Sequence, residues 1–215
     1  ALRKVHDHFG DGFIITMAPE TYYLQTAGSS YPSSYWALAL EIKDILTICY
    51  PQFYNSGSMN GYGGTVVYPG TADFITSLST MLIEGGLRPD QVAFGVPSTS
   101  QAAGSGYVST GVLATAVKAM VNGTSSGKFT APKAYPTIRG VMTWSINWDA
   151  TNNYAWSRAM SDLMDTLPQT PVTPVDPTEP TEAPTEAPTE APTEAPTEKP
   201  TEAPTEAPTE APTEA

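Results

Sequence analysis

Polar and aromatic side chains directly follow each of four apolar runs in this sequence of 215 residues. The four segments are Ala18-Pro19-Glu20, Gln52-Phe53-Tyr54-Asn55, Pro97-Ser98-Thr99 and Asn147-Trp148-Asp149. Their hydroxyls and amides could donate hydrogen bonds to a charge that develops on a bound molecule. Glu20 and Asp149 also suggest a pair of carboxylates that act as acid and base. If the fold brings these segments together, they form one polar site with aromatic walls.

The apolar runs are the elements that must position these segments. Runs rich in β-branched and aromatic residues predict buried strands at residues 13–17, 45–50, 92–96 and 141–146. Helical spacing predicts helices at 35–45, 74–82 and 113–120, and a last helix that begins near Asn152 or Asn153. Strands that alternate with helices indicate an α/β fold with a parallel sheet, whose carboxyl ends all lie at one edge. The four polar segments should therefore converge at that edge.

The last part of the chain has a different composition. Residues 168–215 hold 11 acidic residues, one basic residue (Lys199) and 13 of the 21 prolines. From Pro177 onward the sequence is built from Pro-Thr-Glu-Ala repeats. Regularly spaced proline and glutamate prevent a packed structure, because proline lacks a backbone donor and like charges repel. We expect a folded part, residues 1–167, and a disordered extended linker, residues 168–215, that tethers it to another module.

The folded part lacks the features of several other classes of protein. Its 11 acidic and nine basic residues are nearly balanced, so a nucleic acid is not an expected partner. No apolar run reaches the roughly 18 residues of a membrane-spanning helix, and Cys49 alone cannot form an intrachain disulfide. The glycine-rich segment 61–64 lacks the strand and lysine of a phosphate loop and is expected to be the lip of a long loop. His6 and His8 have no cluster of further ligands, so no metal and no cofactor are expected.

The number of predicted strands is half of what a closed barrel needs. A complete (β/α)8 barrel takes about 250 residues and eight strands, whereas residues 1–167 show four predicted strands. Residues 1–9 look like the end of a helix, and the sequence begins without an initiator methionine or a signal peptide. Four parallel strands alone would also leave two unpaired edges. We therefore expect the chain to be the carboxyl-terminal half of a longer domain.

Four segments carry a resemblance to a known family. The segment 140–149, Gly-Val-Met-Thr-Trp-Ser-Ile-Asn-Trp-Asp, resembles the eighth-strand signature of family 18 glycoside hydrolases, in particular bacterial chitinases. In the same order, 16–20 resembles the fifth strand, 52–55 the sixth, and 95–97 with the loop 102–109 the seventh. The resemblance covers residues 1–167. It implies a (β/α)8 TIM barrel, present from about the fifth to the eighth strand, in a secreted enzyme that hydrolyses β-1,4-linked N-acetylglucosamine polymers.

The resemblance also implies roles for single residues. In this family the acetamido oxygen of the substrate attacks the anomeric carbon while a glutamate protonates the leaving oxygen. Tyr54 is the implied catalytic residue, because its hydroxyl would bind that acetamido oxygen. The implied substrate-binding residues are Gln52, Asn55, Trp144, Met17, Glu20 and Asp149. For Met17, Glu20 and Asp149 a structural role is the alternative. The family's Asp-x-x-Asp-x-Asp-x-Glu motif, which ends in the catalytic glutamate, does not occur in this sequence. We expect it before Ala1 and expect this chain alone to be inactive.

Two other functions fit the same residues. An endo-β-N-acetylglucosaminidase that cuts N-glycans uses similar chemistry on a related barrel, and a chitin-binding lectin of this family has lost the catalytic glutamate. The segments 16–20 and 144–149 favour a chitinase that binds chitin or N-acetylglucosamine oligosaccharides. Aromatic residues that could add sugar contacts, or could instead pack on one another, are Tyr22, Tyr23, Tyr35, Trp36, Tyr62 and Trp148.

Overall fold

The computed structural model describes residues 1–25 and 34–168 of the chain. The predicted linker lies outside these residues except for Pro168. The helices are α1 Leu2–Phe9, α2 Ser34–Glu41, α3 Ala72–Glu84, α4 Thr110–Asn122, α5 Ile146–Thr151 and α6 Ala155–Asp165, with short 3-10 turns at Thr21–Leu24, Tyr62–Gly64 and Pro89–Gln91. The strands are β1 Thr16–Met17, β2 Ile48–Cys49, β3 Met59–Asn60, β4 Val66–Val67, β5 Ala93–Pro97 and β6 Gly140–Trp144.

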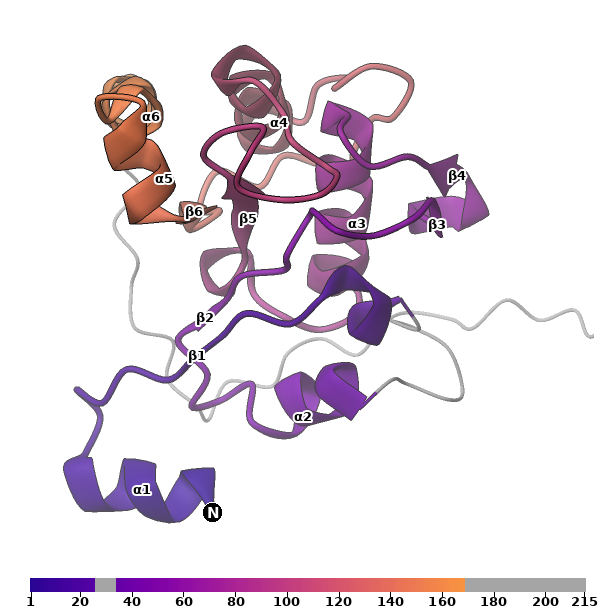
Figure 1. Ribbon diagram of the computed structural model, residues 1–215. Helices are drawn as coiled ribbons and strands as arrows, with labels where there is room; N and C mark the ends of the chain where they lie inside the picture. Colours follow the sequence, from indigo (N-terminus) through magenta and orange to yellow (C-terminus); the bar gives the residue numbers. More distant parts are fainter. Residues whose placement is uncertain (26–33, 169–215) are drawn as a thin grey trace, which may run out of the picture. The chain divides into compact units, whose positions relative to one another are not determined.

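Four strands run parallel in the order β1, β2, β5 and β6 (Figure 1). β1 pairs with β2, and β5 pairs with β6 from Ala93–Gly140 to Pro97–Trp144. Isolated parallel bridges, Cys49 with Val92 and Gln52 with Gly95, connect the two pairs. The prediction of an α/β fold with these four parallel strands is confirmed. Within the described residues the strands do not close into a barrel.

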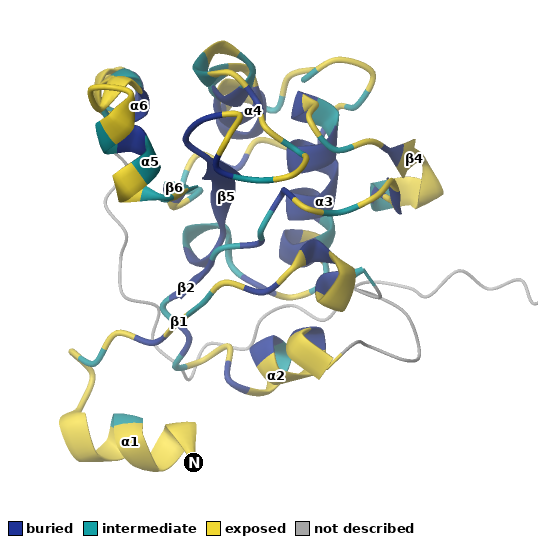
Figure 2. Ribbon diagram, in the orientation of Figure 1, coloured by how far each residue is buried: buried dark blue, intermediate teal, exposed yellow. Residues whose placement is uncertain are grey.

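Strand β5 shares the hydrophobic core with helices α3 and α4. All five residues of β5 are buried (Figure 2). Each helix begins where a hydroxyl satisfies a free backbone N–H: Thr71 Oγ1 accepts from Phe74 N at 3.1 Å, and Ser109 Oγ accepts from Val112 N at 3.3 Å. The predicted helices at 74–82 and 113–120 are therefore confirmed, and each begins two to three residues earlier than predicted, after its capping hydroxyl.

Two local predictions were wrong in detail. The glycine-rich segment 61–64 was expected to be the lip of a long loop, but it connects two short strands, β3 and β4, that pair antiparallel. Strands of two residues are too short to show an alternating pattern in the sequence. The apolar run 141–146 does not stay extended to its end, since α5 begins at Ile146. The last helix, predicted to begin near Asn152 or Asn153, begins at Ala155 after Tyr154, which has a left-handed backbone (φ 55°).

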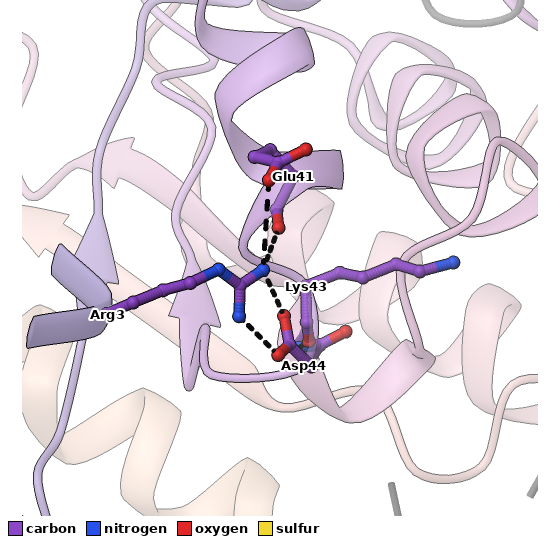
Figure 3. Close-up of polar contacts among 5 residues, drawn as sticks. Arg3, Glu41, Lys43 and Asp44 are labelled. Atoms are coloured by element: carbon purple, nitrogen blue, oxygen red, sulfur yellow. Dashed lines mark hydrogen bonds and ion pairs between the residues drawn. The ribbon is translucent and has the colours of Figure 1, made fainter. Parts of the chain in front are cut away.

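Helix α1 contacts the rest of the fold through an ion pair at the surface. Arg3 Nη1 and Nη2 donate to the two carboxylate oxygens of Asp44 at 2.6 and 3.0 Å, and Nη2 also donates to the carbonyl oxygen of Glu41 (Figure 3). No residue of α1 is buried (Figure 2). This contact joins α1 to the segment that leads into β2, whose other side is packed against the core.

A carboxylate in the first turn of α3 holds the loop of residues 124–131. Asp73 Oδ1 accepts hydrogen bonds from Ser126 Oγ at 2.6 Å and Phe129 N at 3.2 Å, and Oδ2 accepts one from Lys128 N at 2.9 Å. Burial acts to raise the pKa of Asp73, but the hydrogen bonds from this loop outweigh it and lower the pKa. The charged carboxylate is therefore stabilised in the folded state.

We expect Asp73→Asn to lower the free energy of unfolding at pH 7 by about 1–2 kcal/mol, because an amide group replaces one acceptor opposite a backbone N–H. The folded-state pKa of Asp73 lies below the unfolded value. Its stabilising effect is therefore complete above the unfolded pKa and is lost as pH falls through the folded pKa. Urea unfolding should show a smaller difference between the two proteins at about pH 3 than at pH 7. Asp162→Asn, at an exposed position, serves as the control, and an equal difference at both pH values would contradict the prediction.

Candidate active site

The carboxyl ends of the four parallel strands lie at one edge of the sheet. The parallel register continues past the strands, because Glu20 is bridged to Gln52 and Gln52 to Gly95. At the other pair, Pro97 is aligned with Trp144. The sequence segments that were expected to converge therefore start from neighbouring positions in space, with Tyr54 two residues past Gln52.

Tyr54 is the buried tyrosine of this edge. Only 6% of the residue is exposed. Burial raises the pKa of the Tyr54 phenol, and the negative charge of Glu20 raises it further. A phenol with a raised pKa keeps its proton at neutral pH and remains a hydrogen-bond donor. The structure thus brings Tyr54 and Glu20 together, and it keeps Tyr54 in the state in which it can donate.

Gln52 is tied to the neighbouring strand end. Its Nε2 donates to the carbonyl oxygen of Ala18 at 2.6 Å, and its backbone N donates to the carbonyl oxygen of Pro19 at 2.9 Å. These bonds join the segment that follows β2 to the segment that follows β1. The hydrogen bond from Gln52 Nε2 to the Ala18 carbonyl oxygen therefore fixes the orientation of the Gln52 side chain.

Trp144 presents its indole ring to solvent at the end of β6. The residue is 53% exposed. The backbone of Trp144 and Ser145 is held by hydrogen bonds, although the Trp144 side chain is exposed. Ser98 N donates to the Trp144 carbonyl oxygen at 2.9 Å, and Ser98 Oγ donates to the Ser145 carbonyl oxygen at 3.2 Å. The Trp144–Ser145 peptide bond is cis. Ser98 belongs to one of the four polar segments expected at this edge, and in the structure it holds the backbone at the end of β6.

Asn55 and Met17 are placed differently from Tyr54. Asn55 Oδ1 accepts hydrogen bonds from Gly104 N at 2.8 Å and Ser105 N at 3.3 Å, so its amide oxygen is engaged by a loop of the protein. Met17, the last residue of β1, is partly buried and packs against the hydrophobic core. Their assignment as substrate-binding residues stays a prediction.

Asp149 is placed inside the fold and not in the site. It is fully buried, and its carboxylate accepts hydrogen bonds from Trp156 N at 3.0 Å, from Ser157 N at 3.1 Å and from Ser157 Oγ. These donors belong to the first turn of α6. The assignment of Asp149 to substrate binding is therefore replaced by the structural alternative, a carboxylate that caps a helix. A pair of catalytic carboxylates formed by Glu20 and Asp149 does not fit this placement.

The aromatic residues that could add sugar contacts differ in exposure, and two of them, Tyr62 and Trp148, are half-buried. Tyr22, Tyr23 and Tyr35 form an exposed row of edge-to-face pairs with ring centroids 5.5 Å apart. Trp36 is 1% exposed and belongs to the core, so a sugar contact for this residue is wrong. Its indole fills the space beside Gly85. Residues 35–40 are apolar or aromatic at every position, so the spacing in this helix did not show which side meets the core.

The remaining reactive residues play no part at this edge. Cys49 is fully buried in β2, and burial raises the pKa of its thiol to about 12, which suits a small core residue. His6 and His8 lie on α1, and residues 1–25 and 34–168 contain no group of three or more potential metal ligands. No helix in the part of the chain that the structure describes is long and apolar enough to span a membrane.

The fold and the site together fit one class of protein. A parallel α/β sheet carries a protonated phenol, an amide and a carboxylate at one edge, next to an exposed indole. Uncharged hydrogen-bond donors beside an aromatic face suit a polar ligand with apolar C–H faces, such as a sugar. The class indicated is therefore an α/β domain of the carbohydrate-active type.

Comparisons with known proteins name the family within this class. The chain is 39% identical to chitinase Chi52 from Paenibacillus xylanexedens in an alignment 184 positions long, which covers 77% of this chain and 35% of that protein. It is 37% identical to chitinase D from Niallia circulans, with the same coverage. A solved structure of a putative chitinase A from Streptomyces coelicolor shares 44% identity with a TM-score of 0.73, over 77% of this chain and 55% of that one. A family GH18 chitinase from Chromobacterium violaceum shares 35% identity with a TM-score of 0.70, over 76% of this chain and 48% of that one.

The chain belongs to the family 18 glycoside hydrolases, as its strand-end motifs predicted. It spans only 35% of the length of the two curated relatives and about half of the two solved chains. A family model described as "PT disordered repeat" matches residues 179–214, the Pro-Thr-Glu-Ala array.

Proposed function

We propose that the protein containing this chain hydrolyses the β-1,4 linkages of chitin, and that this chain supplies the side of the active site that binds the acetamido group. The observation that carries the proposal is the placement of Tyr54, a buried and protonated phenol at the same sheet edge as Gln52 and the exposed ring of Trp144. The identity to curated chitinases supports chitin as the polymer.

The proposed reaction is substrate-assisted and retains the configuration at the anomeric carbon. The acetamido oxygen attacks that carbon, and the leaving oxygen takes a proton from a glutamate. Positive charge then spreads over the acetamido group, which becomes an oxazolinium ion. The role of Tyr54 is to donate its hydroxyl proton in a hydrogen bond to the acetamido oxygen and so hold it in line with the anomeric carbon. Because the Tyr54 phenol stays protonated, it performs this role without a proton transfer.

Other residues of the edge hold the same sugar. Gln52 is fixed through its amide nitrogen, which leaves its amide oxygen to accept a hydrogen bond from the acetamido N–H. Trp144 offers an indole face to the C–H side of the sugar ring and to the acetamido methyl group. The proposed sugar-binding site is completed by Glu20, Met17 and the amide nitrogen of Asn55. No metal or cofactor takes part in these steps.

The proton donor is proposed to lie outside this sequence. Glu20 lies beside Tyr54 at the end of β1, whereas the catalytic glutamate of the family follows the fourth barrel strand. The proposal therefore places the acid in a (β/α)4 half that completes the barrel. It also predicts that residues 1–215 bind chitin oligosaccharides without cleaving them. The polymeric substrate suits a secreted enzyme, and the repeat array suits a tether to another module.

Binding by residues 1–215 tests the proposed function directly. Titration with a chitin oligosaccharide, followed by calorimetry, should give saturable binding with no release of shorter products. Trp144→Ala should weaken that binding about tenfold or more, because the loss of the indole face removes about 1.5 kcal/mol of contact energy. Ile146→Ala, a change at a 64% exposed residue two positions further on, should leave binding unchanged.

Four outcomes would contradict parts of the proposal. Absence of binding would remove the sugar site from this chain, and cleavage by residues 1–215 alone would place the acid within them. A lectin is indicated if the fourth-strand segment of the longer protein ends in glutamine or leucine in place of glutamate. Release of glycans from glycoproteins, without cleavage of chitin oligomers, would instead indicate an endo-β-N-acetylglucosaminidase.

A further inference from the structure

The loop between β5 and α4 is fastened directly to the residue after Tyr54. Asn55 accepts two hydrogen bonds from this loop through Oδ1, from Gly104 N and Ser105 N, and its own backbone N donates to the Ser105 carbonyl oxygen at 3.2 Å. Asn55 has a left-handed backbone with φ 53°. This conformation lets one residue bind the loop through its backbone and its side chain together.

A glycine brings the same loop against the backbone of Tyr54. Gly106 has φ +84°, and a Cβ added there would lie 2.6 Å from Tyr54 Cα and 2.7 Å from the Phe53 carbonyl oxygen. Real Cβ atoms essentially never approach other atoms so closely. The loop therefore packs on Tyr54 with room for a hydrogen atom only.

The opposite side of this segment is held by the core. Phe53 is 1% exposed, and its ring makes edge-to-face contacts with Phe74 and Phe94, with both centroid distances 6.1 Å. Since Phe53 is fixed in the core, the loop at Gly106 is the surface-side contact that limits where the Tyr54 backbone can lie. The loop itself is anchored by its buried end residues Ala102 and Val108.

We propose that residues 103–106 form a positioning loop for Tyr54, with Asn55 and Gly106 as positioning residues that act through it and do not need to touch the substrate. The inference rests on the proposed role of Tyr54. A hydrogen-bond donor aligns the attacking acetamido oxygen only where it lies at the right distance from that oxygen, and a displacement of about 1 Å can cost about 100-fold in rate. Asn55 thereby gains a function apart from the substrate contact predicted for it.

Gly106→Ala tests the loop against a matched glycine. Gly63 also has a left-handed backbone (φ +74°), but a Cβ there meets nothing within 4 Å, so Gly63→Ala reproduces the backbone strain without the collision. In residues 1–215 with 13C-labelled tyrosine, the Tyr54 signal is identified by its loss in Tyr54→Phe. We expect Gly106→Ala to move the titration of Tyr54 toward that of an ordinary tyrosine, because water reaches the phenol. Gly63→Ala should lower the melting temperature but leave the Tyr54 titration in place.

Asn55→Gly provides the second variant if Gly106→Ala does not fold. Glycine keeps the left-handed backbone and removes only the amide that binds Gly104 and Ser105, so it should shift the Tyr54 titration in the same direction. In the enzyme that carries this chain, both variants should lower kcat by about 10- to 100-fold with KM changed less than about twofold. Unchanged Tyr54 titration in a folded Gly106→Ala or Asn55→Gly protein would overturn the proposal. A shifted titration in a protein that binds no chitin oligosaccharide would keep the positioning loop and reject the proposed function instead.

Discussion

Tyr54→Phe should reduce the turnover of chitin oligosaccharides about 100-fold in the enzyme that carries this chain. The substitution removes one oxygen and leaves the ring, so it deletes the hydrogen bond to the acetamido oxygen with little change in packing. The lost hydrogen bond holds the acetamido oxygen in line with the anomeric carbon, and a misalignment of about 1 Å can cost about 100-fold in rate. Because this alignment is needed in the transition state more than for binding of the substrate, the loss should fall mainly on kcat and less on KM.

The pH dependence provides a second check on Tyr54. Burial and the charge of Glu20 raise the pKa of the Tyr54 phenol, so the protonated donor persists above the pH at which an ordinary tyrosine ionises. Loss of activity through ionisation of Tyr54 should therefore occur only above that pH. Glu20→Gln should lower the pKa of Tyr54, since it removes the negative charge. Turnover by Tyr54→Phe within about twofold of wild type would remove Tyr54 from the mechanism.

Asp149→Ala should lower the free energy of unfolding by about 3 kcal/mol. Asp149 is fully buried and accepts from two backbone N–H groups and one hydroxyl of α6. Alanine leaves those donors without an acceptor in the interior, at about 1–3 kcal/mol for each buried group that finds no new partner. Loss of a helix cap alone would cost about 1 kcal/mol. The larger value is expected here because water does not reach the site of the deletion.

Chemical unfolding of residues 1–215 measures this effect. Asp162→Ala, at an exposed position of α6, is the matched control and should change the free energy of unfolding by less than about 0.5 kcal/mol. Asp149→Asn should lie between the two, since its amide oxygen can still accept from one of the backbone donors. If Asp149→Ala proves as stable as the control, the carboxylate does not hold α6. Weakened sugar binding by a fully stable Asp149→Asn protein would restore the substrate-binding role that burial argues against.

Much of the fold follows from local patterns in the sequence. The strand at 92–96 and the helices at 74–82 and 113–120 were predictable, because apolar spacing acts over only a few residues. The motifs at 52–55 and 140–149 likewise identified the family before any contact was known. Comparison with chitinases confirmed that assignment.

The role of each polar residue was decided by contacts between distant parts of the chain. The sequence presented Glu20, Asn55 and Asp149 as similar polar residues after strands. In the tertiary structure the charge of Glu20 acts on Tyr54, and the amide oxygen of Asn55 accepts a hydrogen bond from Gly104 N. Asp149 is instead buried and accepts a hydrogen bond from the first turn of α6. A side chain's charge and hydrogen-bonding groups are properties of the residue, whereas its burial and its partners depend on which segments the fold packs against it. For this reason the sequence determined the family and the candidate residues, whereas only the tertiary structure distinguished the candidate site residues from residues such as Asp149 that hold the fold together.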